Sequence, residues 1–300
     1  MRNDKLLNYL HLHFIVFIWG FTAVLGALIS IEAIPLVWYR MLLATGFVFI
    51  WIWLRKEKLR FPPKTIAAFF LSGLIIALHW LAFFGAIKVS NVSVTLAIMS
   101  TGAFFTSLLE PLLHKRRVIW YEVLFGFIVI IGLYIIFKVE SQYVWGIVLA
   151  LCASFLGSLF SVINGKFAVK YKASVISFYE LLSGTFCITV FLAISGSFDT
   201  TFFKLSSNDW IYLVILASIC TAYAFIASIH VMKWLSPYTV MLTINMEPVY
   251  GIILALMILG DSENMSPQFY YGASIILVTV AANGILKISH ERKKRGLPHT

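Results

Sequence analysis

Long apolar runs separated by short polar segments are the dominant pattern of the chain. Each run is close to the roughly 20 residues that an α-helix needs to cross the hydrocarbon core of a bilayer. Alternating segments of a membrane barrel are missing, and an open sheet edge cannot be satisfied in lipid. The pattern therefore predicts an all-α, polytopic membrane protein of ten transmembrane helices. The expected spans are 12–30, 34–54, 65–86, 91–113, 119–137, 143–163, 174–195, 209–230, 237–259 and 268–286.

Composition supports a membrane protein and changes how the charge is interpreted. The chain is 61% hydrophobic and 12% charged, whereas soluble domains are about half apolar and about one quarter charged. Its net charge of +10 would suggest nucleic acid in a soluble protein. Most Lys and Arg residues instead occupy the alternate gaps that face the cytoplasm if the N-terminus does, and the opposite loops hold only Lys88, Lys138 and Lys204. This bias predicts a multi-pass protein of the cell (inner) membrane with both termini cytoplasmic, and no nucleic-acid partner.

The N-terminal and cysteine patterns add little chemistry. The N-terminus begins like a signal peptide, but its apolar run continues past Trp19 without a small-residue cleavage site, which indicates a retained first helix. The three cysteines stand alone in apolar runs, without a Cys or His at ligand spacing. We expect no disulfide framework, no metal site and no cofactor.

Two halves of the chain resemble each other. "YRMLLATG" (39–46) resembles "YELLSG" (179–184), and "FGFIVIIG" resembles "YGASIILV" when Gly126 is aligned with Gly272. The expected units are residues 1–138, with helices 1 to 5, and residues 139–300, with helices 6 to 10 and a basic tail. Because five is odd, the second unit must be inserted upside down, and equivalent loops such as "HKRR" and "GDSEN" differ in charge accordingly. Inverted repeats are typical of secondary transporters, whose substrate site lies near the midplane, although a scaffold without transport stays open.

Four ionisable side chains fall inside expected spans, where charge is costly and a functional role is the default hypothesis. Glu110 lies within a turn of the basic "HKRR" segment, so a helix-end carboxylate is its simpler interpretation. Arg40 lies about six residues inside the outer end of its span, where it could bind a ligand or reach the surface. Glu180 occupies the matching position in the second repeat.

Glu247 is the deepest of these side chains, about ten residues from either end of its span. Pro248 frees the carbonyl of Ile244, and Asn245 adds an amide to the same segment. A kinked helix with these groups would form a polar pocket wall. Two roles are open for Glu247: it carries a proton during transport, or it is a protonated carboxyl that joins two helices by hydrogen bonds.

Aromatic residues and a histidine in other spans could complete a pocket for amphiphilic or ring-bearing solutes. They are Trp19, Tyr39, His79, Trp80, Tyr179 and Tyr223. Each of them alone could instead face lipid or serve packing. His11, His13 and His290 are expected at the inner membrane surface. Small residues at four-residue spacing predict close helix packing, namely Ala150, Ser154 and Ser158, and Ala23 with Ala27.

Several segments together resemble the EamA-type branch of the drug/metabolite transporter superfamily. They are "WGFTAVLG", "PLVWYRMLLATG", "NMEPVYGIILALMILG" and "QFYYGASIILVTVAANG". The resemblance implies two five-helix domains and export of small metabolites, often amino acids, or of drugs and amines, through a central cavity. It also implies that the family's Glu-Pro pair corresponds to Glu247 and Pro248, and the acidic residue that closes its last helix pair to Asp261 or Glu263.

The first repeat departs from that family pattern. The alignment of Gly126 with Gly272 places Thr101 and Gly102 opposite the Glu-Pro pair, and a longer second loop would place Ala103 and Phe104 there. Neither register supplies Glu-Pro. "HKRR" also stands where the family usually has Glu, so we expect the two halves to contribute unequally to the pocket.

The expected function is that of a secondary active transporter that exports amino acids or similar small amphiphilic metabolites by alternating access. Its expected partners are the solute, the bilayer and protons, with Glu247 as polar anchor or proton carrier. Alternatives are a drug or amine efflux carrier, and a non-transporting scaffold or receptor. A primary pump and an intramembrane enzyme are disfavoured because a nucleotide-binding loop and the common hydrolase motifs are missing. The sequence does not set the oligomeric state.

Overall fold

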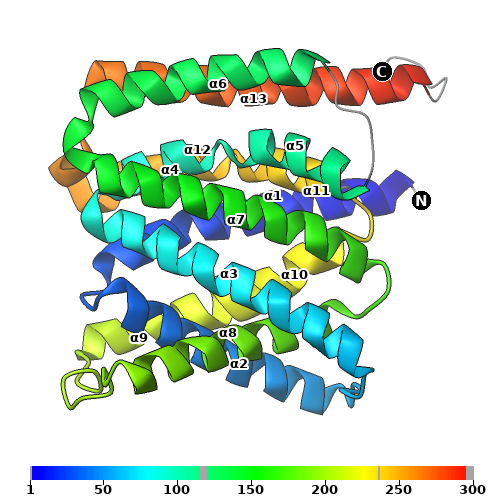
Figure 1. Cartoon of the computed structure of the whole chain (residues 1–300), viewed down its shortest axis with the longest axis vertical. Helices are drawn as coiled ribbons and strands as arrows, with labels where there is room; N and C mark the ends of the chain where they lie inside the picture. The colour runs from blue at the N-terminus through cyan, green and yellow to red at the C-terminus, as the bar shows by residue number, and fades with distance from the viewer. Residues whose placement is uncertain (1, 115–119, 236, 295–300) are drawn as a thin grey trace.

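The computed structural model describes residues 2–114, 120–235 and 237–294, and these residues form helices without a strand. The helices run side by side along one common direction (Figure 1). The all-α prediction is confirmed for the described chain. The first repeat contributes α1 (Arg2–Leu28), α2 (Ala33–Leu54), α3 (Pro63–Val89), α4 (Val92–Met99), α5 (Gly102–His114) and α6 (Trp120–Val139). The second contributes α7 (Val144–Ala168), α8 (Ala173–Ile194), α9 (Ser207–Ala217), α10 (Ala224–Val231), α11 (Pro237–Ile244), α12 (Glu247–Leu259) and α13 (Pro267–Lys294).

Within the described ranges, eight helical segments are long and apolar enough to cross a membrane. A ninth segment, Leu124–Val139, is a shorter apolar helix, and α13 is not among the eight. The count of ten crossings therefore stays a prediction. The first turns of α1 and the last turns of α13 lie at the same end of the bundle (Figure 1).

The fourth expected span of each repeat is broken near its middle. In the first repeat α4 ends at Met99 and α5 begins at Gly102, whereas in the second α11 ends at Ile244 and α12 begins at Glu247. The register that sets Thr101 and Gly102 opposite the Glu-Pro pair agrees with these helix boundaries to within one residue. The break thus occurs in both halves, although only the second half has proline beside it.

Short irregular segments complete the chain. Single 3₁₀ turns precede α7 at Ser141–Tyr143 and follow α12 at Gly260–Glu263. A π-helical turn, Ser218–Tyr223, joins α9 to α10. Such π turns are frequent at functional sites, and this one carries Thr221, which accepts a hydrogen bond from Arg40 of α2.

Helices α6 and α13 form a layer at one side of the bundle (Figure 1). The two helices cross closely at a pair of glycines. A Cβ atom built on Gly272 would lie only 3.0 Å from the carbonyl oxygen of Gly132, so a larger residue at position 272 would crowd the crossing. Gly132 faces Ile276 while Gly272 faces Ile136, so the two helices run antiparallel. Gly126, which the sequence aligns with Gly272, packs against Phe104 instead. The rest of the molecule is one thick bundle, and its interior holds the candidate site.

Candidate functional site

A cavity lies where helices of the two repeats meet. It encloses about 730 Å³ of empty space, its open mouth included. Its walls are mainly apolar and aromatic, with a few polar groups. The lining residues are Trp19, Thr22, Arg40, Ile76, His79, Trp80, Phe83, Met99, Gly157, Phe160, Ser161, Phe225, Ser228, Met232, Met241, Ile244 and Glu247.

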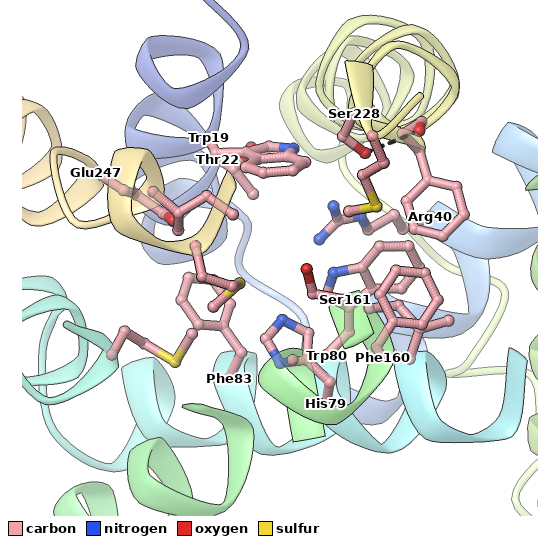
Figure 2. Close-up of a pocket in the computed structure, with 17 residues that line it drawn as sticks. Trp19, Thr22, Arg40, His79, Trp80, Phe83, Phe160, Ser161, Ser228 and Glu247 are labelled. Carbon is pink, nitrogen blue, oxygen red and sulfur yellow. Dashed lines mark hydrogen bonds between the residues drawn. The ribbon is translucent and has the colours of Figure 1, made fainter. Parts of the chain in front are cut away.

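Arg40 brings a positive charge from α2 to this cavity and is 2% exposed. Its Nε donates a 2.7 Å hydrogen bond to Thr221 Oγ1. The guanidinium carbon lies 4.1 Å from the centre of the Trp80 ring, a cation–π contact. The NH1 group is buried without a hydrogen-bond partner among the described residues. Figure 2 shows the guanidinium directed toward the cavity. Arg40 therefore faces a ligand space and does not reach the membrane surface.

Glu247 lies on the other side of the cavity from Arg40 (Figure 2). It is the first residue of α12 and is buried. Its carboxyl group makes no hydrogen bond or salt bridge with a described residue, although it interacts electrostatically with Arg40. A carboxyl group at the N-terminus of a helix is favourably placed with respect to the helix dipole. The Glu247 carboxyl is thus free to bind a solute.

The break before Glu247 tightens the backbone. The N–H groups of Asn245 and Met246 bond to carbonyls three residues earlier, those of Leu242 and Thr243. Asn245 is buried, and its Nδ2 has no partner among the described residues. Its side chain does not line the cavity. Pro248 occupies the first turn of α12, where a missing N–H costs no helical hydrogen bond.

His79 lines the cavity from α3, as the sequence suggests. Its Nδ1 donates to the carbonyl oxygen of Ala153 at 2.7 Å. The ring stacks on Phe83 at 6.1 Å and packs on Gly157. Because Nδ1 carries the donated hydrogen, Nε2 is the remaining nitrogen for a contact with solute.

The other sequence candidates lie outside the cavity. Tyr39 donates to the carbonyl of Phe202 at 3.2 Å within an aromatic cluster. Tyr179 donates to the carbonyl of Leu59. Tyr223 is 43% exposed and forms a 2.7 Å hydrogen bond with His11. Glu180 is fully buried in a separate polar cluster. Among the residues that the sequence suggests for a pocket, Arg40, His79, Trp80, Glu247 and Trp19 meet at one site.

Several lining residues have no distinctive sequence signal. Thr22, Ser161 and Ser228 add hydroxyl groups, and Phe160 stacks on Phe225 with ring centres 5.4 Å apart. These residue types are common in membrane helices. The one signal that could find Ser161 is its place one turn before Asn164 on α7.

The small-residue stripe on α7 does more than allow close packing. Ser158 Oγ donates to the carbonyl of Gly102 at 2.7 Å, and Ser154 Oγ donates to that of Met99 at 3.2 Å. Both carbonyls flank the break between α4 and α5. Ser154 therefore satisfies a carbonyl that the end of α4 leaves free, and Ser158 joins the first turn of α5 to α7.

The resemblance implies that Asp261 or Glu263 is the acidic residue between the last two helices, and in this structure Glu263 caps the N-terminus of another helix. Glu263 is buried, and its carboxylate accepts hydrogen bonds from the N–H groups of Val92 and Ser93 at 3.1 and 2.8 Å. Asp261 is exposed and accepts from Asn264. Glu263 thus joins the second repeat to the N-terminus of α4 in the first. The equivalent "HKRR" segment lies largely outside the described residues, and Glu110 nearby is buried on α5.

A duplicated helical layout around a central cavity is typical of membrane transporters. The EamA-like transporter family model matches residues 8–138 and again 144–284. The chain therefore belongs to the EamA-like transporter family and carries two copies of its repeat.

Relatives and a solved structure agree with this assignment. An "uncharacterized transporter" of Clostridium kluyveri is 22% identical over 81% of this chain and 79% of its own. Another "uncharacterized transporter", of Archaeoglobus fulgidus, is 22% identical over 89% of this chain and 92% of its own. A crystal structure aligns with a TM-score of 0.69 at 15% identity, covering 93% of this chain and 98% of that chain. The latter comparison shows the fold alone.

No cluster of three or more His, Cys, Asp or Glu residues that could hold a metal is found in the parts of the chain that the structure describes. The groups that the cavity offers to a solute are the guanidinium of Arg40, the carboxyl group of Glu247, the imidazole of His79 and several hydroxyls, surrounded by aromatic side chains.

Proposed function

We propose that this protein is a secondary active transporter of the inner cell membrane that exports amino acids or similar small amphiphilic metabolites by alternating access. Residues 1–138 and 139–300 would be the two inverted units that rock against each other, with both termini cytoplasmic. The cavity between them, lined by residues of both units, supports this role.

The unpaired donor group of Arg40 is the observation that carries the proposal. A guanidinium has five N–H donors, whereas Arg40 uses one of them, on Thr221, and leaves NH1 buried without a partner. A buried cation without full hydrogen bonding is costly. A solute carboxylate would supply the missing acceptor and would bind a guanidinium by charge-assisted hydrogen bonds.

Glu247 across the cavity would then bind the ammonium group of the same solute. The aromatic wall, with Trp19, Trp80 and Phe83, would hold an apolar side chain. This division of the cavity fits a zwitterion with an apolar body. A purely cationic drug or amine could bind Glu247 but would leave Arg40 without an acceptor. The positive charge of Arg40 would also repel such a solute.

The test is flux through the purified protein in liposomes. Vesicles are loaded separately with radiolabelled amino acids, their decarboxylated amines and their deaminated acids, and efflux is followed. We expect efflux of one or more amino acids and much weaker efflux of the matching amine and acid. Efflux of amines alone would favour the drug or amine carrier, and no flux of any panel member in either direction would favour the scaffold or receptor.

A further inference from the structure

A second buried polar cluster lies behind the cavity, where α3 of the first repeat meets α7 and α8 of the second. At its centre is Glu180, which is fully buried. Ser72 Oγ donates to Glu180 Oε1 at 2.6 Å, and Asn164 Nδ2 donates to the same oxygen at 2.8 Å. Asn164 Nδ2 also lies 3.2 Å from Ser72 Oγ. Three helices are thus joined through one carboxyl oxygen.

Several polar atoms beside these three residues are buried without a hydrogen-bond partner among the described residues. Glu180 Oε2 and Asn164 Oδ1 are both buried without a partner among the described residues. The hydroxyls of Ser161 and Ser177 are buried and unpartnered as well, each three residues before Asn164 or Glu180 on the same helix face. Unsatisfied groups at this depth are costly. A proton on Oε2 would turn one bare acceptor into a donor and remove the charge.

A metal cation in this place is disfavoured by the packing. A Cβ on Gly73 of α3 would lie 2.3 Å from the carbonyl oxygen of Glu180 and 1.9 Å from Ser183 Oγ. Backbones in such close contact leave little room for an ion with a shell of ligands, whereas a proton needs no added volume.

No other charge in the surrounding helices is available to neutralise Glu180. In the described chain, none of the ionisable side chains on the helices packed against α8 makes a hydrogen bond or ion pair with it. These are Tyr39 and Arg40 on α2, Lys64, His79 and Lys88 on α3, Cys152 and Lys166 on α7, and His230 on α10. Its own helix contributes Tyr179, which bonds to Leu59 instead, and the free Cys187, seven residues further along.

We propose that Glu180 is the proton-binding carboxyl that couples transport to a proton gradient, at a site separate from the solute cavity. The proton would add to Oε2 as it enters and leave from the same atom, with no other bond made or broken. Ser161, which lines the cavity one turn before Asn164, marks the path between the cavity and this cluster. The inference rests on the proposed transport function.

The geometry also indicates how a proton would affect the conformation. The Ser72–Glu180 hydrogen bond joins the two repeats that alternating access moves apart. A charged Glu180 would form stronger hydrogen bonds with Ser72 and Asn164 than a neutral one. Breaking the Ser72–Glu180 hydrogen bond in an interface without water would therefore cost more free energy when Glu180 is charged than when it is protonated. Proton binding would therefore ease the rocking step.

Infrared difference spectroscopy tests this site without a known substrate. Spectra of the full chain in lipid are compared between mildly acidic and mildly alkaline buffer. We expect a protonated-carboxyl band that appears in acid, persists in Glu247→Gln and in the exposed control Glu32→Gln, and is lost in Glu180→Gln. A wild-type spectrum without such a band, or an unchanged band in Glu180→Gln, would overturn the proposal. If Glu180→Gln does not fold, the same spectra are recorded for Ser72→Ala. This variant removes one hydrogen bond to Glu180, so the carboxyl band must shift in frequency if it belongs to Glu180.

Transport provides an independent second measurement. With the L-amino acids as probes, Glu180→Gln is expected to exchange labelled for unlabelled solute at nearly the wild-type rate but to lose accumulation driven by a pH gradient. Equal gradient-driven accumulation in wild type and variant would contradict the coupling role. If wild type moves no amino acid, the proposed function fails, and the infrared result alone decides whether Glu180 binds a proton.

Discussion

Arg40 and Glu247 face the same cavity from opposite sides without forming a salt bridge. The two side chains come from different repeats, and each is at least nine-tenths buried. Direct pairing would satisfy both groups and close the cavity. Their separation leaves a space whose two ends carry complementary chemistry, and a zwitterionic solute fits such a space.

The first prediction concerns Glu247→Gln. The substitution keeps the size of the side chain and removes its negative charge, so a solute ammonium loses a charged acceptor. A hydrogen bond to a charged group contributes about 1.5–3 kcal/mol, so amino-acid flux should fall by about tenfold to a hundredfold. Efflux from liposomes measures it, with Glu32→Gln as an exposed control. Flux close to wild type at every pH tested would limit Glu247 to packing.

The second prediction concerns Arg40→Met and combines two measurements. Loss of the guanidinium should abolish amino-acid binding. It should also raise the thermal stability of the solute-free protein, because a buried cation with an unpaired donor is replaced by an apolar side chain of similar length. Thermal unfolding in detergent, with and without amino acids, checks both effects. The control is Arg55→Met, which makes the same change at the exposed end of α2. A destabilised variant that still binds amino acids would show that Arg40 is structural.

The third prediction concerns the Glu263 cap on α4. In Glu263→Gln one of the two N–H groups, of Val92 or Ser93, loses its acceptor. A buried donor without a partner costs about 1–3 kcal/mol, so thermal stability should fall by about that amount. The control is Asp261→Asn, two residues before Glu263. Asp261 is exposed and accepts a hydrogen bond only from nearby Asn264 among the contacts described, so this change should have little effect. Equal stabilities of the two variants would refute the capping role.

The fourth prediction concerns the α7 serines. Ser158→Ala removes a hydrogen bond to the carbonyl of Gly102 at the break in the fourth span. Such bonds between membrane helices average about 0.6 kcal/mol, so a modest loss of stability is expected. Ser218→Ala is the control, because half-buried Ser218 donates its hydroxyl to the carbonyl of Val214 four residues earlier and not to another helix. A larger loss in the control would contradict the role given to Ser158.

The fifth prediction concerns topology. In a variant without native cysteines, a membrane-impermeant maleimide should label Thr201→Cys from outside intact cells. Lys58→Cys should be labelled only after permeabilisation. Both positions are exposed in the structure. Reporter fusions at the two termini should both report cytoplasm. Labelling of Lys58→Cys in intact cells, or termini in different compartments, would end the inverted-repeat interpretation.

The sequence alone determined the all-α class, the duplicated layout and the membership in a transporter family. These properties depend on the hydrophobic runs, the repeated segments and the charge of the loops. Each of these can be read from neighbouring residues or counted along the chain, without knowing which helices are in contact. It also gave Arg40, His79, Trp80 and Glu247 as candidates, because ionisable and aromatic side chains at membrane depth are conspicuous by position, and the four line one cavity.

Only the tertiary structure decided which of these side chains meet. Tyr39, Tyr223 and Glu180 have the same sequence signal as the cavity residues, yet they point to an aromatic cluster, an exposed surface and a separate polar core. Thr22 lines the cavity without any sequence signal, and Ser161 has only its place one turn before Asn164. The direction of a side chain depends on how far each helix is rotated about its axis, and packing against helices distant in sequence sets that rotation.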